Sequence, residues 1–227
     1  MKKLLFSCAI FFCAVMYSQA QVEVRYGIRG GVNVSGWRGE SMQSLSRLLR
    51  ATNGSVSAAP RFGFHAGGYA AFKITDRFVI EPGLQYSLKG AELNGQLAGL
   101  GNTAIFDLLN ANALFRVQSH YIELPVLAKV YLTDGLHLFA GPQVGYLIDN
   151  RLRTRASVLG FAGYNRLLDI NNGFQKWDFS GVAGIGYTFD NGFNLMAAYD
   201  HGFQRIDDNQ RFATFNRTFK FSLGYEF

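Results

Sequence analysis

The feature that most constrains this chain is an alternation of apolar and polar side chains that recurs in eight segments. In residues 22–35, for example, the apolar side chains take one parity, whereas Glu23, Arg25 and Arg29 take the other. A repeat of two residues belongs to the β-strand, because successive side chains of a strand point to opposite faces. The other segments with this pattern are residues 61–75, 78–89, 121–132, 136–149, 177–189, 193–203 and 215–227. We therefore expect an all-β fold whose strands each have one apolar and one polar face.

The connections between these segments alternate in length. Three are tight turns, at residues 75–77, 133–135 and 190–192, and four are long, at residues 36–60, 90–118, 150–176 and 207–214. An even number of antiparallel strands with short turns at one end and long loops at the other is the layout of an outer-membrane barrel. We therefore expect an eight-stranded antiparallel up-and-down transmembrane β-barrel with short periplasmic turns and long extracellular loops. Several strands exceed the roughly 9–11 residues that a bilayer requires, so we expect them to extend beyond the outer surface.

The first twenty residues differ in character from the rest of the chain. Lys2 and Lys3 precede an apolar run over residues 4–17, and small residues stand at positions 18 and 20. This arrangement is typical of a secretory signal peptide. We expect residues 1–20 to be cleaved and residues 21–227 to form the barrel domain. Both cysteines of the chain lie in the segment removed, which would exclude disulfides, thiol catalysis and cysteine-bound metals from the mature protein.

A water-soluble eight-stranded barrel would show the same alternation. Such a barrel places its apolar side chains inside, whereas a membrane barrel turns them toward lipid, and the alternation alone does not fix which face is inside. The predicted secretion signal, the aromatic residues near strand ends and the apolar last strand, which ends at Phe227, favour lipid on the outside.

Three of the predicted strands contain a proline, at Pro82, Pro125 and Pro142. Proline has no N–H group, so each removes a hydrogen bond from a ladder in which its strand has neighbours on both sides. We expect local β-bulges at these positions.

The segments around these prolines resemble those of a known family. They read EPGLQYSLKG at residues 81–90, YIELPVLAK at residues 121–129 and FAGPQVGY at residues 139–146. In these segments the chain is similar to the outer-membrane β-barrel (PorT-like) family of Bacteroidota, and the resemblance extends over essentially all of the mature chain. It implies a barrel in the outer membrane of a Gram-negative bacterium. One group of that family takes part in protein secretion, and the resemblance implies no catalytic motif.

Charges of both signs lie on the polar face, which a membrane barrel would turn inward. Eight strands leave only enough room inside for side chains to fill, and an unpaired buried charge is costly. We therefore predict a barrel-interior network of ion pairs and hydrogen bonds, with a narrow ion pathway, as in a small porin, as the alternative. The residues assigned to this network are Arg29, Glu81, Lys89, Glu123 and Lys129.

Positive charge gathers in the segments predicted to face outward. The four long connections and their immediate flanks carry a net charge of +7, whereas the rest of the mature chain carries −3. Arginine pairs with phosphate through two hydrogen bonds, so lipopolysaccharide head groups are candidate partners, with a merely solvated rim as the alternative. The residues predicted to contact lipopolysaccharide are Arg151, Arg153, Arg155, Arg205 and Arg211.

The sequence shows few of the motifs that are typical of an enzyme. The four histidines lack the spacing of a metal site, and no nucleophile elbow or phosphate-binding glycine loop is present. Asp200 and His201, near the outer end of a strand, could activate a water, which leaves a rim-sited enzyme as an alternative. We expect no catalytic residues, no metal and no cofactor. A secreted chain without a recognition module is not expected to bind nucleic acid.

The end of the chain carries a further prediction. Tyr225 and Phe227 continue the apolar parity of the last strand, and an exposed apolar strand end can be recognised by strand addition. We predict that these two residues form an assembly signal for the barrel-assembly machinery; completion of an aromatic girdle at the bilayer interface is an equally open reading.

These observations predict a small non-enzymatic outer-membrane barrel with a structural or partner-binding role through its extracellular loops. Its expected partners are outer-membrane lipid or lipopolysaccharide, the barrel-assembly machinery and, in the alternative function, proteins of a secretion system. A deletion strain that no longer exports cargo would favour the secretion role. A steady large conductance in a planar bilayer would favour the porin.

Overall fold

A computed structural model describes residues 23–38, 55–97, 111–158, 161–169, 174–206 and 214–227. The described residues form nine strands, and among them no helix is long and apolar enough to cross a membrane. The strands are β1 (Glu23–Arg38), β2 (Ser55–Thr75), β3 (Phe78–Leu97), β4 (Ala111–Tyr131), β5 (Leu136–Val158), β6 (Phe161–Asp169), β7 (Trp177–Thr188), β8 (Phe193–Arg205) and β9 (Phe215–Glu226). The predicted signal peptide lies outside the described residues.

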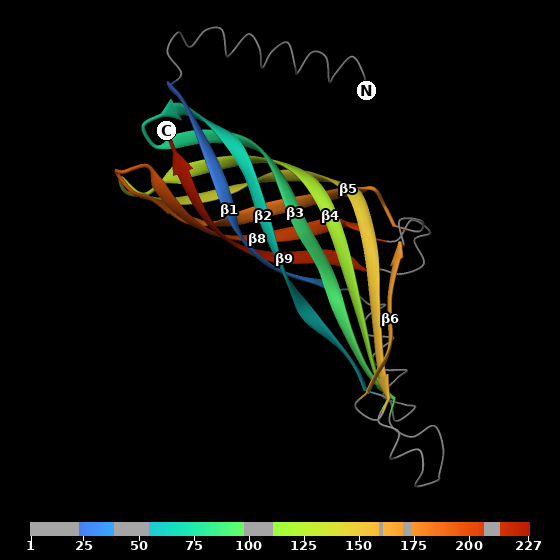
Figure 1. Ribbon diagram of the computed structural model, residues 1–227. Coiled ribbons are helices and arrows are strands. Elements are labelled where there is room, and N and C mark those ends of the chain that lie inside the picture. The colour runs from blue at the N-terminus through green and yellow to red at the C-terminus, as the bar shows by residue number, and fades with distance from the viewer. Residues whose placement is uncertain (1–22, 39–54, 98–110, 159–160, 170–173, 207–213) are drawn as a thin grey trace, which may run out of the picture.

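Eight of the strands close into a barrel (Figure 1). Neighbouring strands pair antiparallel in the order β4, β3, β2, β1, β9, β8, β7 and β5, and β4 also pairs with β5, which completes the ring. At the seam between β1 and β9, the Phe227 N–H donates to the Tyr26 carbonyl oxygen at 2.9 Å. The predicted eight-stranded antiparallel barrel is confirmed. Its short turns and the C-terminus lie at one end, which we call the short-turn end.

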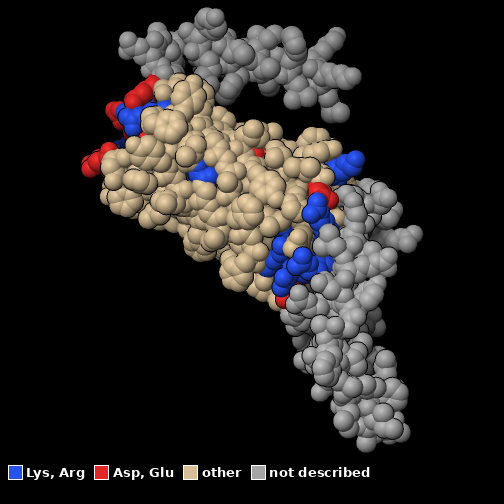
Figure 2. Space-filling model, viewed as in Figure 1, with Lys and Arg blue, Asp and Glu red and all other residues tan. Residues whose placement is uncertain are grey.

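The barrel has a polar inside and an apolar outside. Val32 and Phe221 keep about half of their surface exposed, at 52% and 53%, whereas Lys89 and Glu123 are 2% and 0% exposed. This is the reverse of a soluble barrel and matches a barrel surrounded by lipid. In Figure 2 the charged side chains gather at the two ends of the barrel and are sparse on the belt between them.

Aromatic side chains pack together on the outside near both ends of this belt. Tyr146 and Trp177 meet edge to face with ring centroids 5.0 Å apart near the long-loop end, and Phe193 and Tyr225 do so at 5.1 Å near the short-turn end. Tyrosine and tryptophan favour the interface between lipid and water, so the two groups mark the borders of an apolar belt.

On one side, the strands run far past the barrel. β2 begins at residue 55, β3 ends at 97, β4 begins at 111 and β5 ends at 158, and β6 pairs with the outer part of β5. Much of the segments predicted as long loops is therefore sheet, which we call the extension: residues 55–60, 90–97, 111–118, 150–158 and 161–169. The alternation of apolar and polar residues did not predict the extension, because a strand in water needs no apolar face.

The bulges predicted at the in-strand prolines are wrong. Beside Pro82 and Pro125 the β3–β4 ladder lacks two pairs and then resumes in the same register, and the β4–β5 ladder does the same across from Pro142. Both strands keep the same number of residues across each gap. A missing N–H group therefore opens the ladder locally without shifting it. Register shifts occur at other positions, for example in the β2–β3 pairing between residues 60 and 65 and in the β4–β5 pairing between residues 120 and 121.

Inward glycines make room for large side chains from neighbouring strands. A Cβ atom at Gly31 would lie 2.0 Å from the Phe221 carbonyl oxygen and 2.7 Å from Cε1 of His65. A Cβ atom at Gly184 would lie 2.5 Å from Cζ of Phe139. The high glycine content, 26 residues, thus reflects in part the limited space inside an eight-stranded barrel.

Replacing Gly31 by alanine should therefore destabilise the barrel at its closing seam, by about 1–3 kcal/mol, because the clash involves backbone. Gly30→Ala is the matched control, since the nearest atom to its Cβ would be the His65 carbonyl oxygen at 3.6 Å on the outer face. The free energy of unfolding can be measured by urea titration of the refolded barrel in detergent. Equal stabilities of the two variants would contradict the packing argument.

Candidate functional site

The long-loop half of the lumen holds an ion-pair network that we call the outer cluster: Lys89, Glu123, Asp178, Asp200 and Lys220. The two oxygens of Glu123 receive one lysine each, Lys89 at 2.5 Å and Lys220 at 2.7 Å. Lys220 also contacts Asp200 at 2.6 Å, and Lys89 lies 3.8 Å from Asp178 and 3.7 Å from Asp200. The five residues come from five strands, so the cluster ties β3, β4, β7, β8 and β9 together across the lumen.

Amide side chains add hydrogen bonds to three of these carboxylates. Gln85 donates to Glu123 at 2.8 Å, Gln143 donates to Asp200 at 3.3 Å, and Asn216 donates to Asp178 at 2.9 Å. Buried ion pairs are tolerated when their remaining lone pairs and protons find partners, which is the role of these amides.

The short-turn half holds a second network, the inner cluster: Arg29, Glu81 and Lys129. Glu81 pairs with Arg29 at 2.8 Å through one oxygen and with Lys129 through the other. The guanidinium carbon of Arg29 lies 4.4 Å from the ring centroid of Tyr69, whose hydroxyl accepts a hydrogen bond from Asn194 at 2.8 Å. The aromatic ring thus covers the cationic side of this cluster.

On the side of the lumen formed by β4, β5, β7 and β8, an apolar layer separates the two clusters, whereas His65 and Gln85 line the space between them on the other side. Leu127, Phe139, Val182 and Met196 pack together inside the barrel, and along β4 Leu127 stands between Glu123 and Lys129. The cavity between the clusters measures about 30 Å³, which is room for about two water molecules. Side chains therefore fill this part of the lumen.

The formal charges of the two clusters offset each other. The outer cluster has three carboxylates and two lysines, and the inner cluster has one carboxylate and two cations. With every group ionised, the clusters carry −1 and +1, so the two together are neutral. Neutrality lowers the cost of enclosing eight charges in a narrow lumen.

The five residues assigned to the interior network from the sequence fall into both clusters. Arg29, Glu81 and Lys129 meet in the inner one, and Lys89 and Glu123 meet in the outer one. The assignment left out the other three members of the outer cluster, although their parity already placed them on the polar face. It also missed the apolar layer, whose members share the parity of polar or charged neighbours on their own strands.

The arginines predicted to contact lipopolysaccharide do not form one described cluster. Arg151 is exposed and pairs with Asp149 at 2.6 Å, Arg153 is partly exposed on β5, and Arg205 is exposed at the end of β8. Arg155 lies on β5 in a part whose side chains are not described, and Arg211 lies outside the described residues.

One rim residue was not predicted, because only the strand register shows that it lies beside a predicted arginine. Arg116 on β4 lies directly across from Arg153 on β5 and across from Glu92 on β3, to which its guanidinium binds at 2.8 Å. The strand register therefore sets two arginines side by side at the base of the extension. Figure 2 shows lysine and arginine side chains gathered at this end of the barrel.

Asp200 and His201 do not converge on a common site. Asp200 is buried in the outer cluster, whereas His201 is exposed on the other face of β8, among the rings of Tyr199 and Phe203. Adjacent residues of a strand point to opposite sides of the barrel wall, so the two side chains cannot act on one substrate. Among the described residues, no group of three or more His, Cys, Asp or Glu could hold a metal ion.

Comparison with known proteins is consistent with the barrel geometry. Residues 18–208 match the model of a family described as "Outer membrane protein beta-barrel domain". Among solved structures, Neisserial surface protein A is 11% identical, with a TM-score of 0.45, over 88% of this chain and 95% of that one. The attachment invasion locus protein Ail of Yersinia pestis is 13% identical, with a TM-score of 0.41, over 90% and 99%. OprG from Pseudomonas aeruginosa is 14% identical, with a TM-score of 0.37, over 92% and 98%. No curated protein matches the chain.

Neutralising Glu123, the central carboxylate of the outer cluster, should destabilise the barrel. We expect Glu123→Gln to lower the free energy of unfolding by about 3–5 kcal/mol, because two buried lysines each lose one of their carboxylate partners. The control is Glu23→Gln, whose partner Arg25 is 56% exposed, and its expected cost is below about 1 kcal/mol. Urea titration in detergent measures both. A small loss for Glu123→Gln would mean that the ion pairs do not hold the lumen together.

Proposed function

The chain belongs to the outer membrane protein beta-barrel family, and from that premise we propose that it is a non-enzymatic barrel that binds a partner through its extracellular side. It is a protein of the outer membrane of a Gram-negative bacterium. In a barrel of this layout the short-turn end faces the periplasm and the long-loop end faces outward. The observation that carries the proposal is the extension, a sheet that continues past the apolar belt above a lumen filled by side chains.

The filled lumen supports a binding role over a porin. An ion crossing the barrel would have to displace the apolar layer and separate the ion pairs of both clusters. Arg61, 8% exposed, adds to the closure near the outer end by donating to the backbone carbonyls of Lys89 and Val117 at 3.2 and 2.9 Å.

We propose that the base of the extension contacts phosphate groups of lipopolysaccharide. Arg116 and Arg153 face each other on neighbouring strands with Glu92 as the carboxylate beside them, and Arg151 stands two residues away on β5. Two guanidinium groups near one carboxylate leave positive charge to satisfy, and arginine binds phosphate through two parallel hydrogen bonds. We also propose that Arg155, Arg205 and Arg211 contact lipopolysaccharide, on the basis of the sequence alone.

A component of a protein-secretion system, as in the PorT-like family, is the second candidate function. The specific observation in its favour is β6, which among the described strands pairs only with β5 and so has a free edge of nine residues. A free strand edge can accept a strand from another polypeptide.

At the opposite end, we propose that Tyr225 and Phe227 are recognised by the assembly machinery before closure. Phe227 is 68% exposed, and its N–H group completes the seam with β1. The strand end at Phe227 is therefore available to the machinery until β9 pairs with β1.

The lipopolysaccharide proposal predicts that neutralising the base of the extension weakens binding. We expect the triple variant Arg116→Gln, Arg151→Gln, Arg153→Gln to bind purified lipopolysaccharide about tenfold or more weakly than the parent protein, measured by titration in detergent. The control variant, Lys73→Gln with Arg77→Gln, removes positive charge at the short-turn end and should bind normally. Unchanged binding by the triple variant would remove lipopolysaccharide as the partner of this surface.

A further inference from the structure

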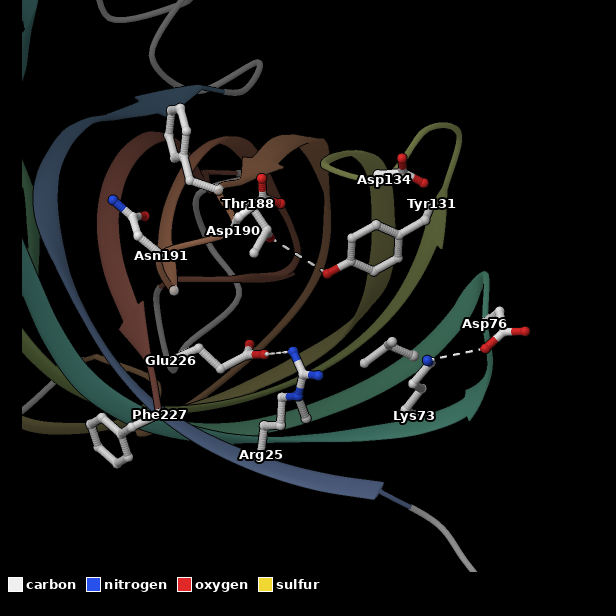
Figure 3. A pocket seen from close by; sticks show the side chains of 14 residues that line it. Arg25, Lys73, Asp76, Tyr131, Asp134, Thr188, Asp190, Asn191, Glu226 and Phe227 are labelled. Atoms are coloured by element: carbon white, nitrogen blue, oxygen red, sulfur yellow. Dashed lines mark hydrogen bonds and ion pairs between the residues drawn. The ribbon is translucent and has the colours of Figure 1, made fainter.

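The short-turn end of the barrel opens into a cavity of about 620 Å³, which we call the periplasmic mouth (Figure 3). Its floor is apolar, because Ala71, Val79 and the ring of Tyr131 close the lumen between the inner cluster and the short-turn end. Its rim consists of the three tight turns together with the ends of β1, β2 and β9. A concave site of this size with an apolar floor and a few converging polar groups is typical of a ligand site.

The charges of the periplasmic mouth are unbalanced. Its lining has two cations and four carboxylates: Arg25, Lys73, Asp76, Asp134, Asp190 and Glu226. Both cations already form ion pairs. Arg25 contacts Glu23, which lies outside the lining, at 2.7 Å, and Lys73 contacts Asp76 of the lining at 3.0 Å. The mouth therefore has more negative charge than its own cations satisfy.

Glu226 is the most enclosed of the four carboxylates, since Asp76, Asp134 and Asp190 are exposed. Its side chain is 11% exposed, yet the ion pair it makes with Arg25 is 3.6 Å long, beyond ordinary hydrogen-bond length. In Figure 3 Glu226 and Arg25 extend from strands on one side of the opening, and Tyr131, Thr188 and Asp190 come from the other. Neither Asp134 nor Asp190 has an ion-pair partner among the described residues.

We propose that the periplasmic mouth binds the cationic side chain of a Lys or Arg residue carried by a periplasmic polypeptide. The charged end would meet Glu226 and Asp190, and its methylene stem would lie over Val79 and Ala71, beside the face of Tyr131. The cavity is larger than one such side chain, so main-chain atoms of the polypeptide also fit. This site lies at the opposite end of the barrel from the extension and serves a partner in a different compartment.

The test uses the refolded full-length barrel in detergent and the tripeptide Ac-Ala-Lys-Ala-NH2, followed by calorimetric titration. The lysine peptide should bind about tenfold or more tightly than the same peptide with norleucine in place of lysine. Asp190→Asn should weaken lysine-peptide binding, and Asp190→Asn with Glu226→Gln should abolish it. Asp149→Asn, which removes a carboxylate at the other end of the barrel, should bind like the parent protein.

Two further titrations identify the source of the cation. Calcium chloride and 1,5-diaminopentane supply positive charge without a peptide main chain, and both should bind more weakly than the lysine peptide. Equal or tighter binding of either would overturn the assignment to a polypeptide. Equal binding of the norleucine peptide, or unchanged binding by Asp190→Asn, would overturn the site itself. Asp190 lies in an exposed turn, so its variant is expected to fold, which the gel mobility of the unboiled sample verifies.

Discussion

Glu123 holds two lysines inside the barrel, one on each carboxylate oxygen, and the rest of the lumen depends on that arrangement. A charge enclosed in a narrow lumen is stable only when its partner is within contact distance and the remaining hydrogen-bonding groups are satisfied. The lysines come from β3 and β9, which are not neighbours in the sheet, so the pairing fixes the barrel across its width. Glu81 does the same for β1 and β4 nearer the periplasm.

The same constraint explains the functional profile. Because the two clusters and the apolar layer between them occupy the lumen, partners can bind at the two ends of the barrel, but the lumen does not form a channel. The outer end carries the extension and a surplus of arginine, and the periplasmic mouth carries a surplus of carboxylate. The membrane wall between them is apolar and bordered by aromatic pairs. The proposed functions follow from this separation of charge along the barrel axis.

The sequence predicted the parts of the fold that alternation controls. The parity of Glu81, Lys89 and Glu123 placed them on one face of each strand, and the eight alternating segments predicted the number of strands in the barrel. Parity does not indicate which charges of that face meet, since Lys220 reaches Glu123 over 97 residues. Nor did it predict the extension, where strands continue in water without an apolar face. The gaps beside Pro82 and Pro125 were mistaken for bulges because a lost hydrogen bond does not require an extra residue.

The central claim is that side chains fill the lumen, and the current carried by the purified barrel across a planar lipid bilayer tests it most directly. The protein should insert, as shown by its protease-resistant barrel and its altered gel mobility when unboiled, and yet carry no steady current at moderate voltage. A stable, ohmic conductance from the folded protein would contradict the account, because it would require a continuous water path through the apolar layer and both clusters.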